Sequence, residues 1–273
     1  MSDFPGPDTT AELRQATSSS AWVQAMLDFE AALAAAEAEQ GLIPSAAAQA
    51  ISGAARAQDF DPEALAAIAA VSSNPTLALI EALRRRVGAE AAPWVHLGAT
   101  SQDVLDSAAM LVTARALQLL RPDLERAASS CARLVRDHRS TLQLARTLLQ
   151  PAVPTTLGLR AAGWLVALLE ALDRLASLGR DRLALQLGGA GGTQAGLGPA
   201  AEAVSQALAT RLGLGLPALP WHGDRARMAQ LGFELGLAAG VCAKIATDVL
   251  LLSQAELGEL REGGAESGSS AMP

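Results

Sequence analysis

The feature that most constrains the fold is a long stretch without proline, from about Asp224 to Arg261. Proline interrupts a helix because it lacks the backbone N–H and its ring clashes with the preceding turn. Apolar residues recur on one stripe of this stretch, at Leu237, Val241, Ile245, Val249 and Leu252. The pattern predicts one helix of about 38 residues, roughly 57 Å long at 1.5 Å per residue, which is very long for a globular protein.

Glycines lie four residues apart on the same predicted helix, at Gly232, Gly236 and Gly240. Small residues at this spacing form a groove that a second helix can approach closely. We therefore expect a bundle of long helices and a homo-oligomer built from them.

The composition supports an all-α fold. Half of the 273 residues are hydrophobic, only 3% are aromatic and tyrosine is absent, which favours helices over strands and supplies a large core. The net charge is -7 and the arginines are dispersed, so no basic surface for nucleic acid is expected. Cys131 and Cys242 are expected to be small hydrophobic side chains, not a disulfide or a metal pair.

The most apolar segment, about Met228 to Leu252, is not expected to cross a membrane. It contains Glu234, Lys244 and Asp248, each of which costs roughly 2.5 kcal/mol or more in hydrocarbon. We interpret it as a buried bundle helix. The chain begins with no secretory signal, so a cytoplasmic location is expected.

The spacing of apolar residues, and the prolines and glycines that interrupt it, divide the remaining chain into predicted helices. The ranges are 18–40, 45–58, 62–70, 74–88, 101–139, 156–187 and 199–213, with a loop centred on Pro151 and Pro154. We expect an N-terminal helical domain over residues 1–93, a central long-helix bundle over 94–261 and a mobile loop over 262–273.

The segment Trp94–Asp106 contains the motif Thr100-Ser101-Gln102-Asp103. Thr100 can cap a helix that starts at Ser101, with Asp103 placed as the acid of a capping box, so an ordinary helix start explains the motif. The side chains of Ser101 and Gln102, with the free amides of a helix N-terminus, also suit a bound carboxylate.

Two further segments are rich in polar or glycine residues. In 145–158, hydroxyl and amide side chains cluster beside two prolines that stiffen the chain, which suits an anion site. The glycines of 188–192 permit a tight turn or close approach of a ligand. They form neither a P-loop nor a dinucleotide fingerprint, because no Gly-Lys-Ser/Thr follows and Gln194 stands where the third glycine belongs. His96, His138 and His222 lack metal-ligand spacing, so no cofactor and no metal are expected.

Four collinear segments resemble the fumarase/aspartase/adenylosuccinate lyase superfamily. They are the helices from Trp22 to Pro44, the motif at 100–103, the segment 146–158 and the terminal Gly268-Ser269-Ser270-Ala271-Met272-Pro273. The last resembles the front half of the family's catalytic loop, so we expect the chain to be C-terminally truncated. Within the superfamily, the segments Trp94–Val104, Gln150–Thr156, Ala161–Trp164, Gly188–Thr193 and Pro220–His222 most resemble the bacterial 3-carboxy-cis,cis-muconate cycloisomerase family.

The resemblance implies roles for individual residues. Ser269 matches the serine that exchanges the carbon-bound proton, with Ser270 beside it as a second candidate. The residues implied to bind substrate carboxylates are Thr100, Ser101, Gln102, Thr147 and Gln150. His96 matches a substrate-contacting histidine of the family. The alternative is that it is a histidine of the core with no contact to substrate. His222, followed by Arg225 and Arg227, can supply a cationic edge or serve only the entry to the next helix.

The resemblance also implies a reaction, ring closure of 3-carboxy-cis,cis-muconate to carboxymuconolactone in protocatechuate breakdown (the beta-ketoadipate pathway). Adenylosuccinate lyase has a histidine acid where this chain has Leu148. Leucine cannot protonate a nitrogen leaving group, whereas a carboxylate with a pKa near ~4 leaves without a proton. An adenylosuccinate-lyase-like activity and a catalytically silent oligomerising fragment remain as alternatives.

The implied partners are a small polycarboxylate substrate and further copies of the chain. Superfamily members build each active site from three subunits, so we expect a homotetramer with shared active sites.

Overall fold

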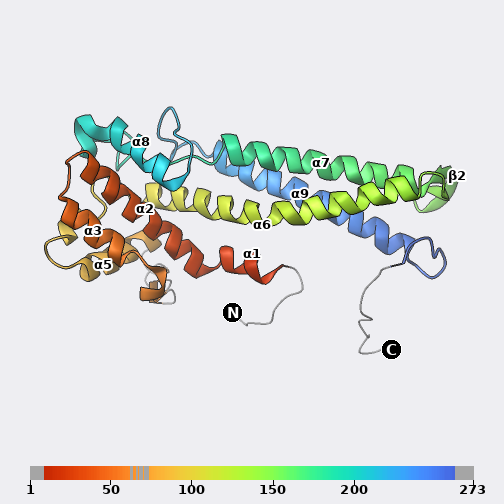
Figure 1. Ribbon diagram of the computed structural model, residues 1–273, viewed down its shortest axis with the longest axis horizontal. Helices are drawn as coiled ribbons and strands as arrows, with labels where there is room; N and C mark the ends of the chain where they lie inside the picture. Colours follow the sequence, from red (N-terminus) through yellow and green to blue (C-terminus); the bar gives the residue numbers. More distant parts are fainter. Residues whose placement is uncertain (1–8, 62–63, 66, 68–69, 71–73, 262–273) are drawn as a thin grey trace. The chain divides into compact units, whose positions relative to one another are not determined.

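The computed structural model describes residues 9–261 except 62–63, 66, 68–69 and 71–73 (Figure 1). The helices are α1 (Ala11–Ala16), α2 (Ser19–Glu39), α3 (Ser45–Ala54), η1 (Ala57–Asp59), α5 (Pro75–Val87), η2 (Ala92–Trp94), α6 (Ser101–Asp137), α7 (Leu157–Asp181), η3 (Ala195–Ala200), α8 (Ala201–Leu212) and α9 (Ala226–Leu252). The strands are β1 (Leu142–Thr147) and β2 (Gln150–Thr156). The fold is therefore mostly helical, as the composition predicts.

The chain divides into two compact units. Unit 1 comprises Met1–Arg121 and Ala176–Gln230, and unit 2 comprises Pro122–Leu175 and Leu231–Pro273. The predicted domain boundaries at residues 93 and 261 stay a prediction.

Local signals set the first helices of unit 1. The Ser18 side chain accepts a hydrogen bond from the Ala21 N–H at the start of α2, and Gly41 follows its end with φ +72°. At α5, the Asn74 side chain accepts from the N–H groups of Thr76 and Leu77. Both helices therefore lie within one residue or two of their predicted ranges.

The core of unit 1 is built where α2 packs against α3 and α8. Its largest fully buried side chains on these helices and on α5 are Leu27, Phe29, Leu33, Ile51, Leu79, Leu83 and Leu208. Burying such side chains is worth about 1.5–3 kcal/mol each and dominates the stability of the unit.

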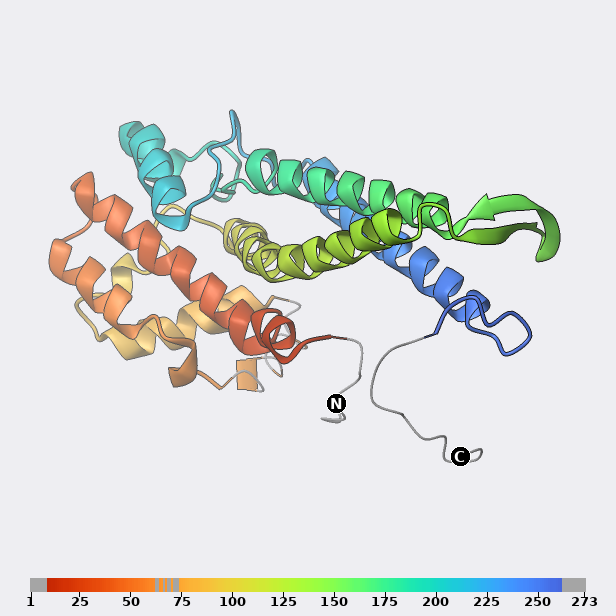
Figure 2. The same ribbon diagram turned by 45° about the vertical axis from the view of Figure 1, so that its right-hand side comes forward.

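A β-hairpin in unit 2 replaces the loop predicted around Pro151 and Pro154 (Figure 2). A two-stranded sheet leaves one edge of each strand unpaired, so prolines fit without costing ladder hydrogen bonds. Pro151 lies opposite Arg146, and the register shifts between Leu144 and Arg146. The prediction of a loop was wrong, because proline excludes a segment from a helix or a central strand but not from an edge strand.

Two long helices end earlier than predicted. α7 stops at Asp181 and not at Leu187, because the following residues are extended and the Leu185 N–H donates to the Gly215 carbonyl. α9 stops at Leu252, where the chain turns back and the N–H groups of Glu259 and Leu260 donate to the Leu252 carbonyl.

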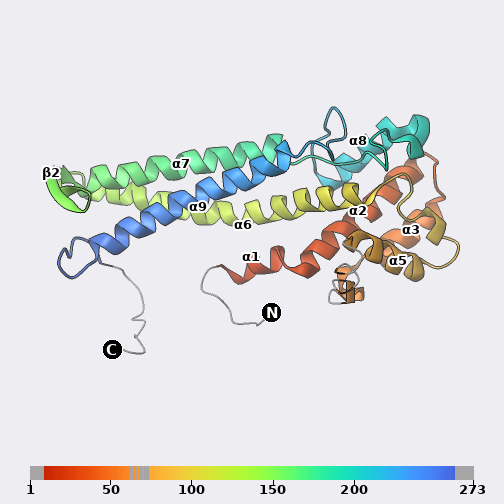
Figure 3. The same cartoon turned by 180° about the vertical axis from the view of Figure 1, so that it is seen from behind.

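The core of unit 2 lies between the parts of α6, α7 and α9 that belong to it (Figure 3). Trp164 is buried there, and its indole N–H donates to Asp248 at 2.7 Å. The other buried members are Ala128, Cys131, Ala161, Leu168 and Leu252.

α9 is mostly uncovered in the single chain, contrary to the predicted buried helix. Among the described helices, α9 is the one that is long and apolar enough to cross a membrane by length and composition alone. Only 11% of its most apolar 18-residue segment is buried. Phe233 and Leu250 are 60% and 62% exposed. An exposed apolar face of this length indicates a partner surface.

Candidate active site

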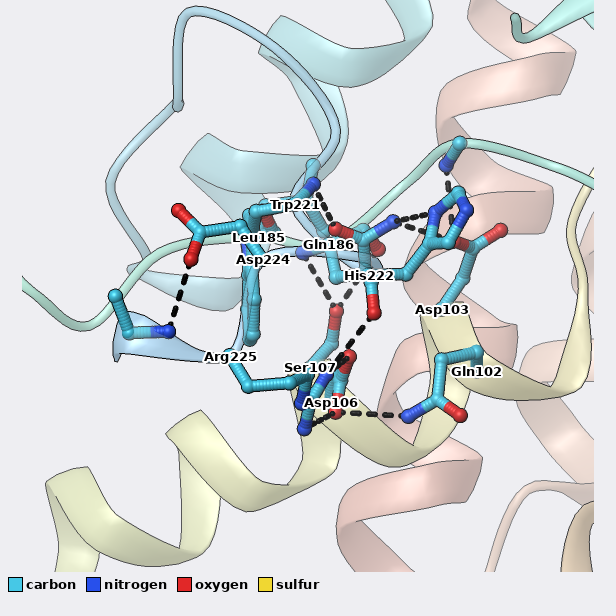
Figure 4. A network of polar contacts seen from close by, with 12 residues as sticks. Gln102, Asp103, Asp106, Ser107, Leu185, Gln186, Trp221, His222, Asp224 and Arg225 are labelled. Atoms are coloured by element: carbon cyan, nitrogen blue, oxygen red, sulfur yellow. Dashed lines mark hydrogen bonds and ion pairs between the residues drawn. The ribbon is translucent and has the colours of Figure 1, made fainter. Parts of the chain in front are cut away.

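Asp103, in the first turn of α6, is the centre of a buried polar network in unit 1 (Figure 4). Its Oδ2 accepts hydrogen bonds from the N–H groups of Thr100 and Gly189, both at 2.9 Å. Its Oδ1 accepts from the Gly188 N–H and the Gln186 Nε2, also at 2.9 Å. The aspartate of the motif therefore caps its own helix and holds the segment that precedes the glycine turn.

Gln186 links Asp103 to the chain around Trp221 and His222. Its Oε1 accepts from the Trp221 N–H at 2.6 Å, and its Nε2 lies 3.2 Å from the His222 Nδ1. Its backbone N–H donates to the Ser107 hydroxyl, which lies on α6, at 3.0 Å. Every polar group of this fully buried residue has a partner.

Glycines make room for the ring of His222. A Cβ at Gly188 would lie 3.0 Å from the His222 Nδ1, and one at Gly192 would lie 3.0 Å from its Cε1. Close approach in the glycine cluster therefore serves a histidine of this chain, where the sequence left open a turn or a ligand.

Gln102 and Arg225 meet on the carboxylate of Asp106. The Gln102 Nε2 donates to the Asp106 Oδ1 at 2.9 Å, and the Arg225 guanidinium binds both carboxylate oxygens at 2.7 and 2.9 Å. The hydrogen bonding that Arg225 donates to Asp106 raises the pKa of Arg225. The Arg225 cation is thus already paired, and it also lies over the Trp221 ring at 5.7 Å.

His96 contacts a buried acid of α2. Its Nδ1 lies 2.7 Å from the Glu30 Oε1, and its backbone has φ +67°, a conformation that non-glycine residues rarely adopt. Glu37 is fully buried two turns further along α2. Burial, and then the charge of Glu30, raise the pKa of Glu37 to about 8.

Ser101 is tied to the start of α5, because its hydroxyl accepts from the Asn74 Nδ2 at 2.9 Å. Thr100 lies immediately before α6 and is half-buried. Five of the predicted substrate-binding residues, His96, Thr100, Ser101, Gln102 and His222, thus belong to unit 1.

Thr147 and Gln150 belong to unit 2, where they are paired next to the tip of the hairpin and exposed. The tip is Leu148-Leu149, with φ +49° and +61° and side chains 95% and 69% exposed. Two-residue hairpin turns of this kind favour Asn-Gly, so two leucines make a strained turn.

Arg146 lies in the same hairpin and forms a bidentate ion pair with Glu259, at 3.1 and 2.7 Å. The hydrogen bonds of this pair raise the pKa of Arg146 and lower that of Glu259. Ser269 and Ser270, the predicted catalytic residues, lie outside the described residues.

Sequence reasoning missed Gln186 and Asp106. The available signal for Gln186 was a single amide in an apolar run, Leu183-Ala-Leu-Gln-Leu. Asp106 lies in the segment Trp94–Asp106, but no role was predicted for it.

No cluster of His, Cys, Asp and Glu that could hold a metal occurs among the described residues. In unit 1, Thr100, Ser101, Gln102, His96 and His222 have side chains that can donate N–H or O–H hydrogen bonds, the kind of group that binds carboxylates.

Comparisons with known proteins identify the family to which the chain belongs. A lyase family model matches residues 7–273. The chain is 47% identical over 270 residues to a 3-carboxy-cis,cis-muconate cycloisomerase of Bradyrhizobium diazoefficiens, covering 97% of the chain and 60% of the relative. It is 46% identical to the enzyme of the same name from Pseudomonas aeruginosa, covering 100% and 62%, and 44% identical to a nitrosuccinate lyase of Streptomyces davaonensis, covering 94% and 57%.

Among solved structures, the 3-carboxy-cis,cis-muconate lactonizing enzyme of Pseudomonas putida superimposes with a TM-score of 0.88 at 43% identity. The match covers 92% of the chain and 57% of that structure. The chain therefore spans about three fifths of the length of the relatives it matches.

Proposed function

Because this chain belongs to the lyase family, we propose that its function is that of a 3-carboxy-cis,cis-muconate cycloisomerase. In this reaction a carboxylate of the substrate adds to a double bond of the same molecule and gives carboxymuconolactone. The observation that carries the proposal is 47% and 46% identity to two enzymes of that name over nearly the whole chain.

The position of Leu148 supports this reaction over adenylosuccinate-type elimination. Leu148 lies at the exposed tip of the hairpin and has no proton to give. In the reverse of ring closure a carboxylate leaves, and with a pKa of roughly 4 it needs no acid. Only the proton at carbon must be moved, and we propose that Ser269 does this, with Ser270 as the second candidate.

Substrate recognition falls to neutral donors in the described part of the site. Arg225 and Arg146 are each paired with a carboxylate of this chain. We propose that Thr100, Ser101, Gln102, Thr147, Gln150, His96 and His222 bind the substrate carboxylates, each hydrogen bond to a charged group contributing roughly 1.5–3 kcal/mol. No cofactor takes part in the proposed step.

We propose that the protein is a cytoplasmic homotetramer with active sites shared between copies. The uncovered face of α9 supports association, since Gly232, Gly236 and Gly240 have nothing within 4 Å of an added Cβ. The groove beside them has a volume of about 620 Å³ and is lined by Trp164, Phe233 and Leu237 among others. An exposed apolar groove of this kind is typical of a surface against which a second helix packs.

The association is tested with two matched glycine variants. Gly236→Leu fills the groove on α9, whereas Gly53→Leu adds the same side chain on α3, where an added Cβ also meets nothing within 4 Å. Light scattering should show a loss of the oligomer for Gly236→Leu alone. An unchanged oligomer in both variants would place the interface elsewhere.

The activity is tested by following the absorbance of 3-carboxymuconate with the chain and with Ser269→Ala. Turnover that disappears in the variant supports the cycloisomerase and the role of Ser269. A folded oligomer without turnover contradicts the proposal for this chain. The 44% identity to a nitrosuccinate lyase makes nitrosuccinate the second substrate to assay, and faster turnover of it would overturn the first choice.

A further inference from the structure

The side-chain amide of Gln186 is held in one orientation. Its oxygen accepts from the Trp221 backbone N–H at 2.6 Å, and a backbone N–H can only donate. Its nitrogen lies 2.9 Å from the Asp103 Oδ1, which also accepts from the Gly188 N–H. A flipped amide would set N–H against N–H at one end and oxygen against oxygen at the other, so the assignment follows from the contacts.

This orientation decides which nitrogen of His222 carries the proton. The amide nitrogen of Gln186 has two hydrogens, and one is used by Asp103. The other points to the His222 Nδ1 at 3.2 Å, so that nitrogen must offer its lone pair. In the neutral ring the proton then lies on Nε2. A second proton, on Nδ1, would face the Gln186 N–H, so only the neutral ring keeps this hydrogen bond.

The Nε2 side of the ring is open to a ligand. Among the described residues none forms a hydrogen bond with the His222 Nε2, and the side chain is half-buried. A Cβ on Gly192 would lie 3.5 Å from Nε2 and 3.0 Å from Cε1, so glycine at 192 keeps this edge uncovered. The charged group closest to the ring in this network is Asp103, which shares the Gln186 amide with His222. Asp106 and Arg225 pair with each other, and the Asp224 carboxylate points away from the ring and accepts from the Ala226 N–H (Figure 4).

We propose that Gln186 is a positioning residue that holds His222 as the neutral Nε2–H tautomer, so that Nε2–H donates a hydrogen bond to a carboxylate of the substrate. The part concerning the substrate rests on the proposed function, whereas the tautomer does not. This assignment differs from both roles that the sequence left open for His222, a cationic edge and a structural role at the entry to the next helix, and gives it a neutral donor instead. In this tautomer the ring uses its Nδ1 lone pair for Gln186 and offers one N–H, at Nε2, to the substrate.

The tautomer is measured by nitrogen-15 NMR of protein labelled in histidine and glutamine, at pH 8 and without substrate. The chain has three histidines, and the spectrum of His222→Asn assigns the resonances of His222. We expect Nδ1 at the unprotonated limit, Nε2 at the protonated limit, and a coupling through the hydrogen bond between Gln186 Nε2 and His222 Nδ1. A protonated Nδ1, or averaged shifts as in free histidine, would overturn the proposal.

Two variants of Gln186 change the tautomer in different ways. Gln186→Met removes the amide, and the His222 shifts should move to the averaged values of a free ring. Gln186→Glu still accepts from the Trp221 N–H but can only accept from Nδ1, so the proton should move to Nδ1. Gln24→Met is the matched control, because Gln24 also accepts a backbone N–H, from Ala57 at 2.8 Å, and donates to a carboxylate, of Asp28 at 2.8 Å.

The control should leave the His222 spectrum unchanged. The wild-type spectrum decides the tautomer even where a variant fails to fold.

The donor role is measured separately by turnover of 3-carboxymuconate. His222→Phe removes the N–H and should lower kcat/KM about 10- to 100-fold, mainly through KM, as expected for a hydrogen bond to a charged group. His222→Gln retains an N–H and should restore part of the loss. Equal kcat/KM in all three proteins would overturn the donor role while the spectra still decide the tautomer.

Discussion

Two fully buried carboxyl groups in unit 1 have opposite surroundings. Asp103 of α6 accepts four N–H hydrogen bonds, from Thr100, Gln186, Gly188 and Gly189. Glu37 of α2 has no hydrogen-bond partner for either oxygen among the described residues. Both are inaccessible to solvent, so burial alone does not decide how a carboxyl group behaves.

The difference lies in what packs against each helix. Asp103 faces extended and turn segments, whose backbone N–H groups are free to donate, whereas α2 packs against α3 and α8, whose N–H groups are used within the helices. Burial then raises the pKa of Glu37 to about 8, and the charge of Glu30 adds to the effect. Donors make Asp103 an anchor, and their absence makes Glu37 a group that takes up a proton on folding.

The most severe test of the comparison is Asp103→Ala. It leaves four buried donors without their acceptor, and we expect unfolding free energy to fall by about 3–5 kcal/mol, measured by chemical denaturation. Asp123→Ala, which removes an exposed carboxylate paired with Arg126, should cost less than about 1 kcal/mol. Similar losses in both variants would show that Asp103 is not an anchor.

Glu37→Gln should change the dependence of stability on pH. The pKa of Glu37 is higher in the folded chain than in the unfolded one, so the folded state holds an extra proton between about pH 4.5 and 8. Its stability therefore decreases as pH rises through this window, by up to about 1.4 kcal/mol per pH unit, and the decrease ends above pH 8. The variant should lose this slope, so the difference between the two denaturation curves, measured from pH 5 to 8, isolates Glu37. A constant difference would contradict the raised pKa.

Gly189→Ala tests whether the donors of Asp103 need glycine. Gly189 has φ +66°, and an added Cβ would lie 2.7 Å from the Gly98 carbonyl oxygen. Gly213 has nearly the same φ, +65°, with nothing within 4 Å. We expect Gly189→Ala to cost about 2–3 kcal/mol and Gly213→Ala about 1 kcal/mol in thermal or chemical unfolding, the difference being the clash. Equal losses of unfolding free energy in the two variants would show that backbone strain causes both losses and that the clash at Gly189 adds nothing.

The smallest effect is expected for Arg225→Ala. It removes the bidentate partner of Asp106, which keeps the hydrogen bond from Gln102. Because Arg225 is half exposed, we expect a loss of only about 1–2 kcal/mol in unfolding free energy. Arg126→Ala, in the exposed pair with Asp123, should change stability by less than about 0.5 kcal/mol.

The parts of the fold that could be predicted from sequence are those set by neighbouring residues. Ser18 and Asn74 cap α2 and α5, and glycines follow the ends of both, so these helices were placed closely. The end of α9 was not, because the turn after Leu252 is held by Glu259 pairing with Arg146, 113 residues away. The hairpin was missed because prolines argue against a central strand but fit edge strands, and both strands of a two-stranded sheet are edge strands.

The same distinction applies to the candidate site. The motif around Thr100 predicts a helix start, and the structure confirms that α6 begins at Ser101. Three of the four partners of Asp103 lie 83 to 86 residues further along the chain, and no periodicity of the sequence indicates such contacts. The roles of the predicted substrate-binding residues stay predictions.

Unit 1 is assembled from two separated stretches of chain, Met1–Arg121 and Ala176–Gln230, which has a consequence for its synthesis. A ribosome adds about 5–20 residues per second, so the intervening segment takes roughly 3–10 s to make. During that interval Asp103 has been translated but Gln186, Gly188 and Gly189 have not. The first stretch therefore cannot complete unit 1 until the second stretch has been made, and a slow stretch of codons within residues 122–175 would lengthen that interval.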